Sequence, residues 1–374
     1  MMVGVGTEWP PGRPLPRRRC RDVASVNLAQ MPGGGRKKVA HAAEARYWAP
    51  GALRGMIDSL YTPFSGPGGE EIDEQALRAL VDHCLGALDH DGIWVGGLVG
   101  ECWALSTSER KRILEVAVDE VRAIKPGALV EACPASTNVL ETVDLAQHAA
   151  ATGADICFLI PPYFEARGYE STRELLRYVS DRTDIALGLF NTHAAGWILT
   201  PDECARLVDE FPAICAVKNG MFRPSHTAAL HRLVPELVIW ECDMLAYRGG
   251  FLRRGIAAAG ILGGSGYLYE LPDNRIYSTQ WDLLVSDKLS EAIDHWYESG
   301  LDDLVARLHG AFGASNVEAV YTHWGSAFKA AAQELGLPVG GYARSRSPQP
   351  PLPQAQRAAI RAAYAAIGFV PAAS

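Results

Sequence analysis

The sequence contains no Cys-x-x-Cys pair, no His-x-x-x-His or His-x-His pair, and no Walker-type phosphate loop. The eight cysteines are scattered and most lie inside apolar runs, which is typical of buried, reduced thiols in a cytoplasmic protein. Because ligand pairs are missing, we expect no metal and no other separate cofactor. The chain also lacks an apolar run long enough to span a bilayer, so we expect no membrane association.

The net charge of −8 is distributed unevenly along the 374 residues. Residues 1–50 hold nine Lys and Arg against three acids, a net +6, so the remainder carries −14. An acidic body argues against nucleic-acid binding by the main domain. Residues 1–50 are also rich in Pro, Gly and Arg and have no apolar period, and we expect them to be disordered.

The basic run Arg17-Arg18-Arg19 fits either a targeting presequence or a tail that binds nucleic acid. No apolar core follows it, which argues against a secretory signal. We favour an extension without function, for which Met31 or Met56 is an alternative start.

From residue 54 onward, short apolar runs alternate with helical patterns. Asp73, Ser106 (with Glu109 three residues on) and Thr200 are the expected helix caps. Eight strand–helix units over roughly 230 residues predict an α/β protein, a (β/α)8 TIM barrel. We place the barrel at residues 51–270 and a helical extension at 271–374. A doubly wound sheet is the alternative, but no Gly-x-Gly-x-x-Gly follows the first strand. The predicted strands lie near residues 55–61, 93–95, 128–132, 155–160, 185–190, 214–218, 237–241 and 257–262.

The predicted sixth strand ends in Lys218, and we expect Asn219-Gly220 to form the turn after it. Burial disfavours an ammonium group, so the pKa of Lys218 should fall. A partly neutral lysine can attack a carbonyl and form a Schiff base. A lysine that extends from a strand end into solvent is the more common case. In a barrel, however, the carboxyl ends of the strands converge on the active site.

This convergence selects the candidate site. His193, which can titrate near neutral pH, and Glu241, an acid at a strand end, are the candidate catalytic partners of Lys218. His193 also fits an ordinary loop histidine. We expect Glu101 to brace its own loop through backbone N–H groups. The candidate substrate-binding residues are Thr62, Gly97, Leu98, Val99, Tyr163, Phe190, Asn191, Asp243, Leu262 and Gly263.

Aromatic and aliphatic side chains are frequent near the predicted strand ends. They suit an apolar or aromatic substrate, or equally a core or a subunit interface. Three tyrosines are candidate phenol donors: Tyr163, Tyr267 and Tyr269. The apolar candidates are Trp94, Trp103, Trp197, Leu98, Val99, Phe164 and Phe190.

The chain resembles the dihydrodipicolinate synthase and N-acetylneuraminate lyase superfamily of class I, pyruvate-type aldolases. The resemblance implies a lyase in which Lys218 forms a covalent imine with a 2-oxo acid such as pyruvate or its aldol adducts. It also implies a homotetramer, with a dimer as the alternative, and gives Asp243 a place like that of a lyase residue that binds substrate hydroxyls. The matching pieces, within residues 53–368, are Thr62-Pro63-Phe64 with Ile72-Asp73, Gly97 to Glu101, Phe190-Asn191, Val217-Lys218, Gly260 to Ser265, and Pro351 to Ile367.

The chain departs from the family pattern at polar positions. Leu98 and Val99 replace two hydroxyl residues, Phe190 replaces the proton-relay tyrosine, and Phe164 replaces a second tyrosine of the synthase. The arginine of the synthase is missing from residues 192–197. Each lost bond to a carboxylate costs roughly 1.5–3 kcal/mol. We therefore expect a Schiff-base lyase but not an authentic dihydrodipicolinate synthase. The alternative is a non-catalytic member that binds a metabolite or a partner.

Overall fold

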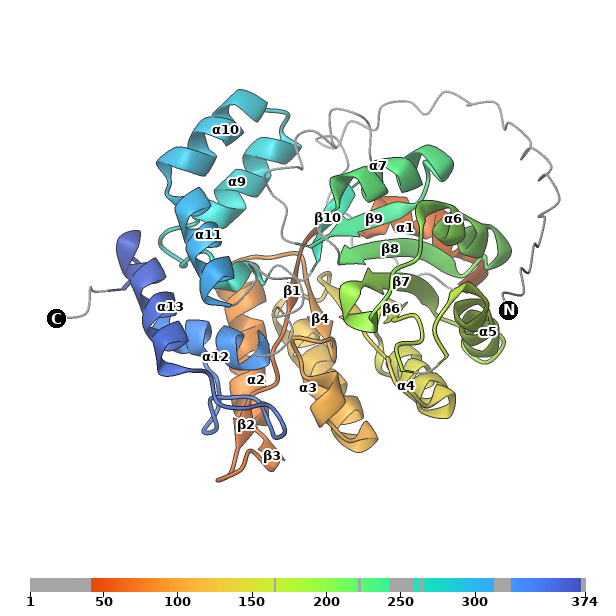
Figure 1. Ribbon diagram of the computed structural model, residues 1–374, viewed down its shortest axis with the longest axis horizontal. Coiled ribbons are helices and arrows are strands. Elements are labelled where there is room, and N and C mark those ends of the chain that lie inside the picture. The colour runs from red at the N-terminus through yellow and green to blue at the C-terminus, as the bar shows by residue number, and fades with distance from the viewer. Residues whose placement is uncertain are drawn as a thin grey trace, which may run out of the picture.

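Eight parallel strands close into a barrel in the order β1-β10-β9-β8-β7-β6-β5-β4 (Figure 1). The computed structural model describes residues 42–164, 166–220, 223–242, 258–262, 265–312 and 324–370. The predicted TIM barrel is confirmed. Its strands are β1 (Gly55–Ser59), β4 (Gly92–Val95), β5 (Leu129–Ala132), β6 (Ile156–Leu159), β7 (Ala186–Thr192), β8 (Ile214–Gly220), β9 (Val238–Glu241) and β10 (Ala258–Leu262).

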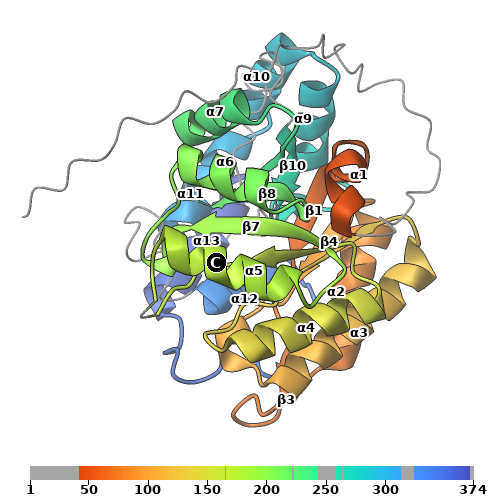
Figure 2. The same cartoon turned by 90° about the vertical axis from the view of Figure 1, so that its right-hand side faces the viewer.

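The barrel closes through β1, which pairs with β10 on one side and β4 on the other. Helices cover its outer face, as the two views in Figures 1 and 2 show. A helix expected at residues 245–254 lies outside the described residues. The described helices around the strands are α2 (Glu74–Asp82), α3 (Thr107–Ile124), α4 (Val139–Thr152), α5 (Tyr169–Ser180), α6 (Pro201–Glu210) and α7 (Pro224–Leu233).

The helix starts follow the predicted capping chemistry. The carboxylate of Asp73 accepts a hydrogen bond from Ala76 N at 2.9 Å at the start of α2. Ser106 and Thr200 each begin a complete capping box, at α3 and α6. These side chains satisfy backbone N–H groups that have no partner inside the helix, and thereby define where each helix begins.

A short helix covers the amino-terminal ends of the strands. A 3-10 turn (Ala42–Glu44) leads into α1 (Ala45–Ala52), whose Ala45 and Ala49 are fully buried among the side chains that point into the barrel. Arg46 Nε donates to the carbonyl of Ile214, the first residue of β8, at 3.3 Å. The expectation of disorder up to residue 50 is therefore wrong for residues 42–50. Residues 1–41 lie outside the described part of the chain.

Strands β7 and β8 extend further than the sequence predicted. Asn191 pairs with Asn219 and Thr192 with Gly220, so Asn219-Gly220 is the end of β8 and not a turn. The expected Asn-Gly turn is therefore wrong. The ladder that carries Lys218 continues past it, which holds the lysine inside a seven-residue strand that is buried throughout.

The carboxyl-terminal region is helical, as predicted, and packs beside the barrel (Figure 1). Tyr61 Oη donates to Pro338 O at 3.0 Å, and Tyr342 N donates to Phe64 O at 2.7 Å. The domain boundary at residue 270 stays a prediction. A two-stranded hairpin of β2 (Phe64–Ser65) and β3 (Glu71–Ile72) was not foreseen. The helices are α9 (Ile276–Val285), α10 (Leu289–Glu298), α11 (Leu301–Ala311), α12 (Trp324–Glu334) and α13 (Gln354–Ala366).

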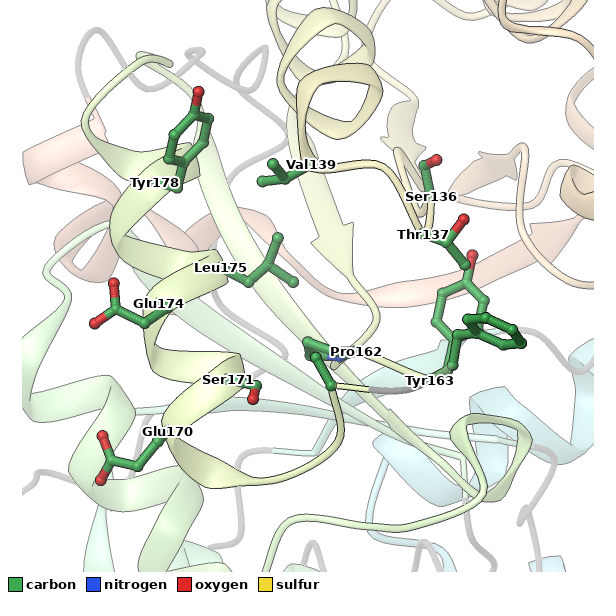
Figure 3. Close-up of a pocket in the computed structure, with 12 residues that line it drawn as sticks. Ser136, Thr137, Val139, Pro162, Tyr163, Glu170, Ser171, Glu174, Leu175 and Tyr178 are labelled. Atoms are coloured by element: carbon green, nitrogen blue, oxygen red, sulfur yellow. The ribbon is translucent and has the colours of Figure 1, made fainter.

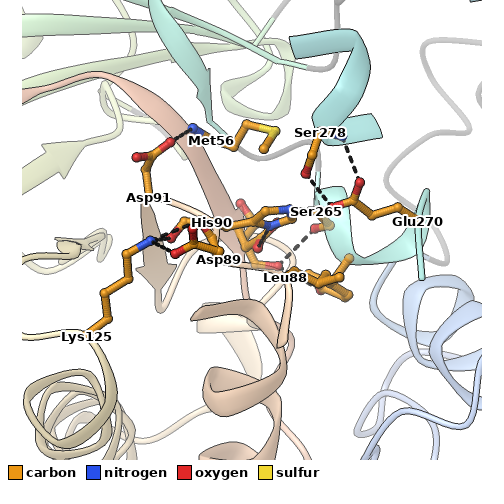
Figure 4. Close-up of polar contacts among 12 residues, drawn as sticks. Met56, Leu88, Asp89, His90, Asp91, Lys125, Ser265, Glu270 and Ser278 are labelled. Atoms are coloured by element: carbon orange, nitrogen blue, oxygen red, sulfur yellow. Dashed lines mark hydrogen bonds and ion pairs between the residues drawn. The ribbon is translucent and has the colours of Figure 1, made fainter. Parts of the chain in front are cut away.

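A buried histidine joins the barrel to the segment before α9 (Figure 4). His90 Nδ1 lies 2.6 Å from Asp58 Oδ2 on β1, and His90 Nε2 lies 2.8 Å from Glu270 Oε1. Ser278 N donates to Glu270 Oε2 at 2.7 Å. All three titratable groups are at most 1% exposed. This network is a buried polar link between elements far apart in the sequence.

Burial by itself lowers the pKa of His90, but the two carboxylates outweigh it and raise the pKa to about 10. The imidazolium is therefore favoured in the folded state, whereas an unfolded histidine titrates near 6.5. Because the folded pKa is the higher one, the stabilisation is complete below about pH 6.5. It is lost as the pH rises through about 10.

We predict that His90→Gln lowers the free energy of unfolding by about 3–5 kcal/mol at pH 6, because it leaves Asp58 buried without its cation and Glu270 with Arg275 alone. Urea unfolding followed by circular dichroism measures this. The difference from the wild type should shrink between pH 6.5 and 10. The matched control is His148→Gln, since His148 pairs with Glu115 at 3.3 Å on the surface. Its effect should stay within about 1 kcal/mol. Equal effects of the two variants would contradict the prediction.

Candidate active site

Lys218 points into the barrel from β8. Strand residues alternate between the two faces of a sheet, and Lys218 pairs with Phe190 on β7 and with Trp240 on β9. Phe190 and Trp240 both belong to the cluster that fills the barrel interior. The lysine is 3% exposed. The predicted candidate nucleophile thus lies in the barrel lumen and not on the outer surface.

Two aromatic faces enclose the amine of Lys218. Its Nζ lies 3.1 Å from the ring centroid of Trp94 and 4.1 Å from that of Phe190. The two rings meet edge to face with centroids 5.0 Å apart. Gly97 lies against the same indole, since a Cβ there would be 3.2 Å from it. Ring faces stabilise an ammonium without accepting its hydrogen bonds as strongly as an oxygen does.

Burial lowers the pKa of Lys218 to about 8, although Cys242, Cys133 and Glu131 raise it in part. The expected fall in the pKa is thus supported. At this pKa, about one amine in ten is neutral at pH 7. The site can therefore present a neutral amine, the form that attacks a carbonyl.

Glu131 is a site residue that was not predicted from the sequence. This residue pairs with Trp94 across β4 and β5, faces the barrel interior and is fully buried. In the sequence it lies inside the apolar run Leu129–Ala132 and belongs to no motif. An acid inside a predicted continuous apolar strand is the signal that could have identified it.

Glu241 lies on the opposite face of its strand from the lysine. It pairs with Asn219, so both side chains point outward to α7, where Thr227 lies. Asn219 Nδ2 donates to Thr227 Oγ1 at 2.8 Å, and Thr227 Oγ1 donates to Glu241. The expectation that Glu241 reaches the cleft is therefore corrected. Its neighbour Trp240 is the residue of β9 that faces the lumen.

Asn191 also points away from Lys218. Its Nδ2 donates to Leu199 O at 2.9 Å, and its Oδ1 accepts from Leu199 N at 2.9 Å. Both ends of the amide are thus used to hold the segment before α6. This bonding corrects the expectation that Asn191 binds substrate, because residue 190 and not 191 has the inward face.

The loop after β4 carries two apolar residues that lie in different clusters. Leu98 is half-buried against the barrel-interior cluster, whereas Val99 belongs to the outer core. Thr62 Oγ1 donates to Gly100 O at 2.7 Å and braces the loop. Of these candidate substrate-binding residues, Leu98 therefore lies on the side of the loop that faces the barrel interior. Thr62 instead supports the loop through its hydrogen bond to Gly100.

Glu101 anchors the loop to the carboxyl-terminal region. It adopts a left-handed backbone, φ +59°. Its Oε1 lies 2.6 Å from Lys329 Nζ on α12, and its Oε2 accepts from Arg346 N at 3.2 Å. Burial raises the pKa of Glu101, and burial lowers that of Lys329 to about 8. The expected structural role is supported, but the partners belong to another segment and not to the loop of Glu101 itself.

The mouth of the barrel carries His193 and Tyr163. His193 begins the 3-10 turn His193–Ala195 directly after β7 and is half-buried. Tyr163 packs against the barrel-interior cluster. Burial raises the pKa of Tyr163 to about 12, so its phenol is protonated at neutral pH. Trp197 Nε1 donates to Pro162 O at 2.8 Å and ties the two loops together. The catalytic role of His193 stays a prediction.

The other two candidate phenols are committed to packing. Tyr267 Oη donates to Ser59 O at 2.9 Å and the residue is fully buried. Tyr269 stacks on Tyr277 with ring centroids 5.3 Å apart. Tyr163 is therefore the one of the three tyrosines that the structure places at the mouth.

A surface cavity of about 600 Å3 lies between α5 and the start of α4 (Figure 3). Ser136, Tyr163 and Phe164 are among its lining residues, and Phe164 is 70% exposed. Lys218 does not line this cavity. Tyr163 lines this cavity and also packs against the barrel-interior cluster.

The remaining predicted site residues are not described. Asp243 and Gly263 lie outside the described residues, and Leu262 ends β10 without a described side chain. Among the residues that the structure describes, no three or more His, Cys, Asp or Glu side chains are grouped as a metal site. Within the same residues, every helix is too short or too polar to cross a bilayer.

Comparisons with known proteins agree with this geometry. The sequence profile of the dihydrodipicolinate synthetase family matches residues 52–246. A 4-hydroxy-tetrahydrodipicolinate synthase from Methanothrix thermoacetophila is 34% identical over 45% of this chain and 54% of that protein. An N-acetylneuraminate lyase from Salmonella paratyphi B is 28% identical over 59% of this chain and 70% of that protein. The chain thus spans about half the length of the first relative.

A solved structure shares the fold. The chloride-inhibited dihydrodipicolinate synthase from Acinetobacter baumannii, complexed with pyruvate, superposes with a TM-score of 0.71 at 21% identity, over 85% of this chain and all of that one. This likeness shows a shared fold. The chain belongs to the dihydrodipicolinate synthetase family, and the resemblance seen in the sequence is confirmed.

We predict that Lys329→Met lowers the free energy of unfolding by about 3–5 kcal/mol, because Glu101 then remains buried without its cation. Thermal and urea unfolding measure the change. Lys111→Met is the matched control, since Lys111 pairs with Asp144 at 2.7 Å with both side chains partly exposed. That variant should lose only about 0.2–1 kcal/mol. A loss for Lys329→Met no larger than the control would refute the anchoring role of Glu101.

Proposed function

We propose that this protein is a Schiff-base lyase in which Lys218 forms an imine with a 2-oxo acid such as pyruvate. The observation that carries the proposal is the position of Lys218, which is inward-facing and 3% exposed with a pKa lowered to about 8. The family relatives are a synthase and a lyase, and the Acinetobacter relative was solved with pyruvate. No separate cofactor is needed for this chemistry, because the lysine itself holds the substrate.

The proposed reaction begins with attack of the neutral Lys218 amine on the C2 carbonyl. A proton added to the carbinolamine hydroxyl lets that group leave as water, and the result is an iminium in which the Lys218 nitrogen keeps one proton and the positive charge. The iminium then accepts the electron pair released when a carbon–carbon bond breaks or when a proton leaves C3, which gives an enamine. For carbon–oxygen cleavage, the enamine returns this pair and expels the hydroxyl group of C4, which leaves with its own bonding pair and a proton as water. Addition of water reverses imine formation and releases the product.

A proton must move to and from the substrate without the family's relay tyrosine, which is Phe190 here. We propose His193 or the phenol of Tyr163 as the group that moves it, since both lie at the barrel mouth. Glu241 is withdrawn from this role because Thr227 binds it outside the barrel. The high pKa of Tyr163 favours a phenol that donates a proton over one that accepts it.

The apolar mouth argues for a substrate other than that of authentic dihydrodipicolinate synthase. Leu98 and Trp197 pack against the barrel-interior cluster that contains Phe190. Leu98 and Phe190 carry no hydrogen-bond donor for a substrate carboxylate, and Trp197 Nε1 already donates to Pro162 O. We propose a 2-oxo acid, or an aldol adduct of one, whose distal part is apolar or aromatic.

A non-catalytic role is the second candidate, because the nearest side chain to Nζ on β7 is a phenyl ring at 4.1 Å and not a phenol. In that case the barrel binds a metabolite or partner without turnover. A homotetramer or homodimer is proposed from the family resemblance alone, and a cytoplasmic location from the scattered cysteines in apolar runs.

We predict that incubation with pyruvate or another 2-oxo acid followed by borohydride adds the mass of one reduced adduct per chain, and that peptide mapping places it on Lys218. Lys218→Ala should abolish the adduct. The panel should include pyruvate, 2-oxobutyrate and phenylpyruvate. Lys329 is the internal control, since its pKa is also about 8 but Glu101 pairs with it. An adduct on Lys329, or none from any acid in folded protein, would favour the second candidate.

The rate of trapping should depend on pH with a midpoint near 8, because only the neutral amine attacks. With pyruvate and cyanoborohydride, labelling at pH 7 should be about ten times slower than on the plateau above pH 9. Labelling of Lys288, whose side chain is 54% exposed, corrects for the reagent's own pH dependence. A midpoint near the ordinary lysine value of 10.5 would contradict the assignment.

A further inference from the structure

A carboxylate lies inside the barrel with the lysine. Glu131 is fully buried on β5, and its register partner Trp94 carries Lys218 Nζ over its ring at 3.1 Å. Its charge acts on Lys218 and also on Cys215, which lies nearer the start of β8. Glu131 is therefore an inner-face residue within electrostatic reach of the amine, on the side of the lumen away from the mouth.

The other groups that act on Lys218 are thiols. Cys133 and Cys242 follow β5 and β9, and Cys242 also forms a side-chain hydrogen bond with the lysine. Burial raises the pKa of Cys133, so this thiol is neutral at physiological pH. Two arginines near the lumen act on thiols, Arg46 on Cys215 and Arg110 on Cys133. Among the described residues that raise the pKa of Lys218, namely Cys242, Cys133 and Glu131, Glu131 is the carboxylate.

The inner face of the barrel also carries N–H and O–H groups beside Glu131 and Lys218. Ser59 Oγ, Trp94 Nε1 and Trp240 Nε1 are buried and form no hydrogen bond with other described protein atoms. Ser59 pairs with Trp94, and Trp240 pairs with Lys218, so all three residues face the lumen. Buried donors of this kind normally meet a ligand or an ordered water. The lumen is therefore polar around the lysine in spite of its aromatic rings.

We propose that Glu131 is a positioning residue that supplies the counter-charge for the Lys218 ammonium and for the iminium formed on it. The second half rests on the proposed function. The reason is electrostatic: a cation enclosed in a barrel requires an opposite charge, and the ring faces of Trp94 and Phe190 provide only part of it. Because the imine nitrogen keeps its proton, the same counter-charge serves the free lysine and the covalent intermediate.

The direct test is competitive acetylation with acetic anhydride across pH 6–11, with the acetylated fraction of each lysine read by peptide mapping. In Glu131→Gln, which keeps the shape and removes the charge, the midpoint for Lys218 should fall by about one pH unit. Lys288 supplies the exposed reference in every sample. A merely structural role of Glu131 would leave the midpoint unchanged, and that result would overturn the proposal.

Glu241→Gln is the matched control. Glu241 is an equally buried carboxyl, 2% exposed, but it lies on the outer face against Thr227. Its substitution should leave the Lys218 midpoint where it is in the wild type. An equal shift in both variants would show a general loss of packing and would also overturn the proposal.

A second measurement tests the proposal if Lys218 does not react with acetic anhydride or if Glu131→Gln is destabilised. Unfolding is compared for the wild type, Glu131→Gln, Lys218→Met and the double variant. Paired charges require Glu131→Gln to be destabilising when Lys218 is present and neutral or stabilising when it is Met. An identical effect in the two backgrounds would refute the pairing.

Neither measurement requires imine formation, so the two proposals can fail separately. A shifted Lys218 midpoint in protein that traps no 2-oxo acid would retain the counter-charge and reject the lyase. Trapping at Lys218 with an unchanged midpoint in Glu131→Gln would retain the lyase and reject Glu131.

Discussion

The cost of placing an ammonium group inside a closed barrel governs the chemistry of this protein. Removal of one ion from water costs several kcal/mol, and the barrel interior around Lys218 offers aromatic faces in place of water. The lysine responds with a lowered pKa, which burial causes and nearby groups oppose. The same burial that is unfavourable for the cation leaves part of the amine neutral near pH 7, the form that can attack a carbonyl.

The two-residue period of the strands decides which side chains share that interior. On β8 and β9, Lys218 and Trp240 face inward, and Asn219 and Glu241 face outward to α7. The outward groups have a structural role, because the hydrogen bonds that join Asn219, Thr227 and Glu241 connect helix α7 to the strands. The barrel thus separates the residues that line its interior from the residues that hold its helix layer, although they alternate in sequence.

The fold could be predicted because its signals are local. Apolar runs mark the strands, and side chains such as Asp73 and Ser106 mark helix starts whatever the tertiary context. Helix α1 was missed because Ala45 and Ala49 become buried only when they pack against the bottom of a closed barrel. Its composition alone does not distinguish it from the Pro- and Gly-rich stretch before it.

The site was predicted less completely, for a geometric reason. Which face a strand-end residue takes depends on exact register, and a register shift between Leu187 and Gly188 separates β7 from an ideal ladder. A one-residue error therefore exchanges Phe190 for Asn191. Glu131 was missed because an acid within an apolar run carries no motif, and only the closed barrel places it on the same inner face as Lys218. The sequence did identify Lys218, because a terminal lysine on an apolar strand is informative once the barrel is recognised.

The most direct test of this account is a crystal structure of the protein soaked with pyruvate. The account predicts continuous electron density from Lys218 Nζ to C2 of the ligand, with Trp94, Phe190 and Glu131 around it and Glu241 outside the barrel. Density joined to another lysine, or a ligand bound without contact to Lys218, would contradict it.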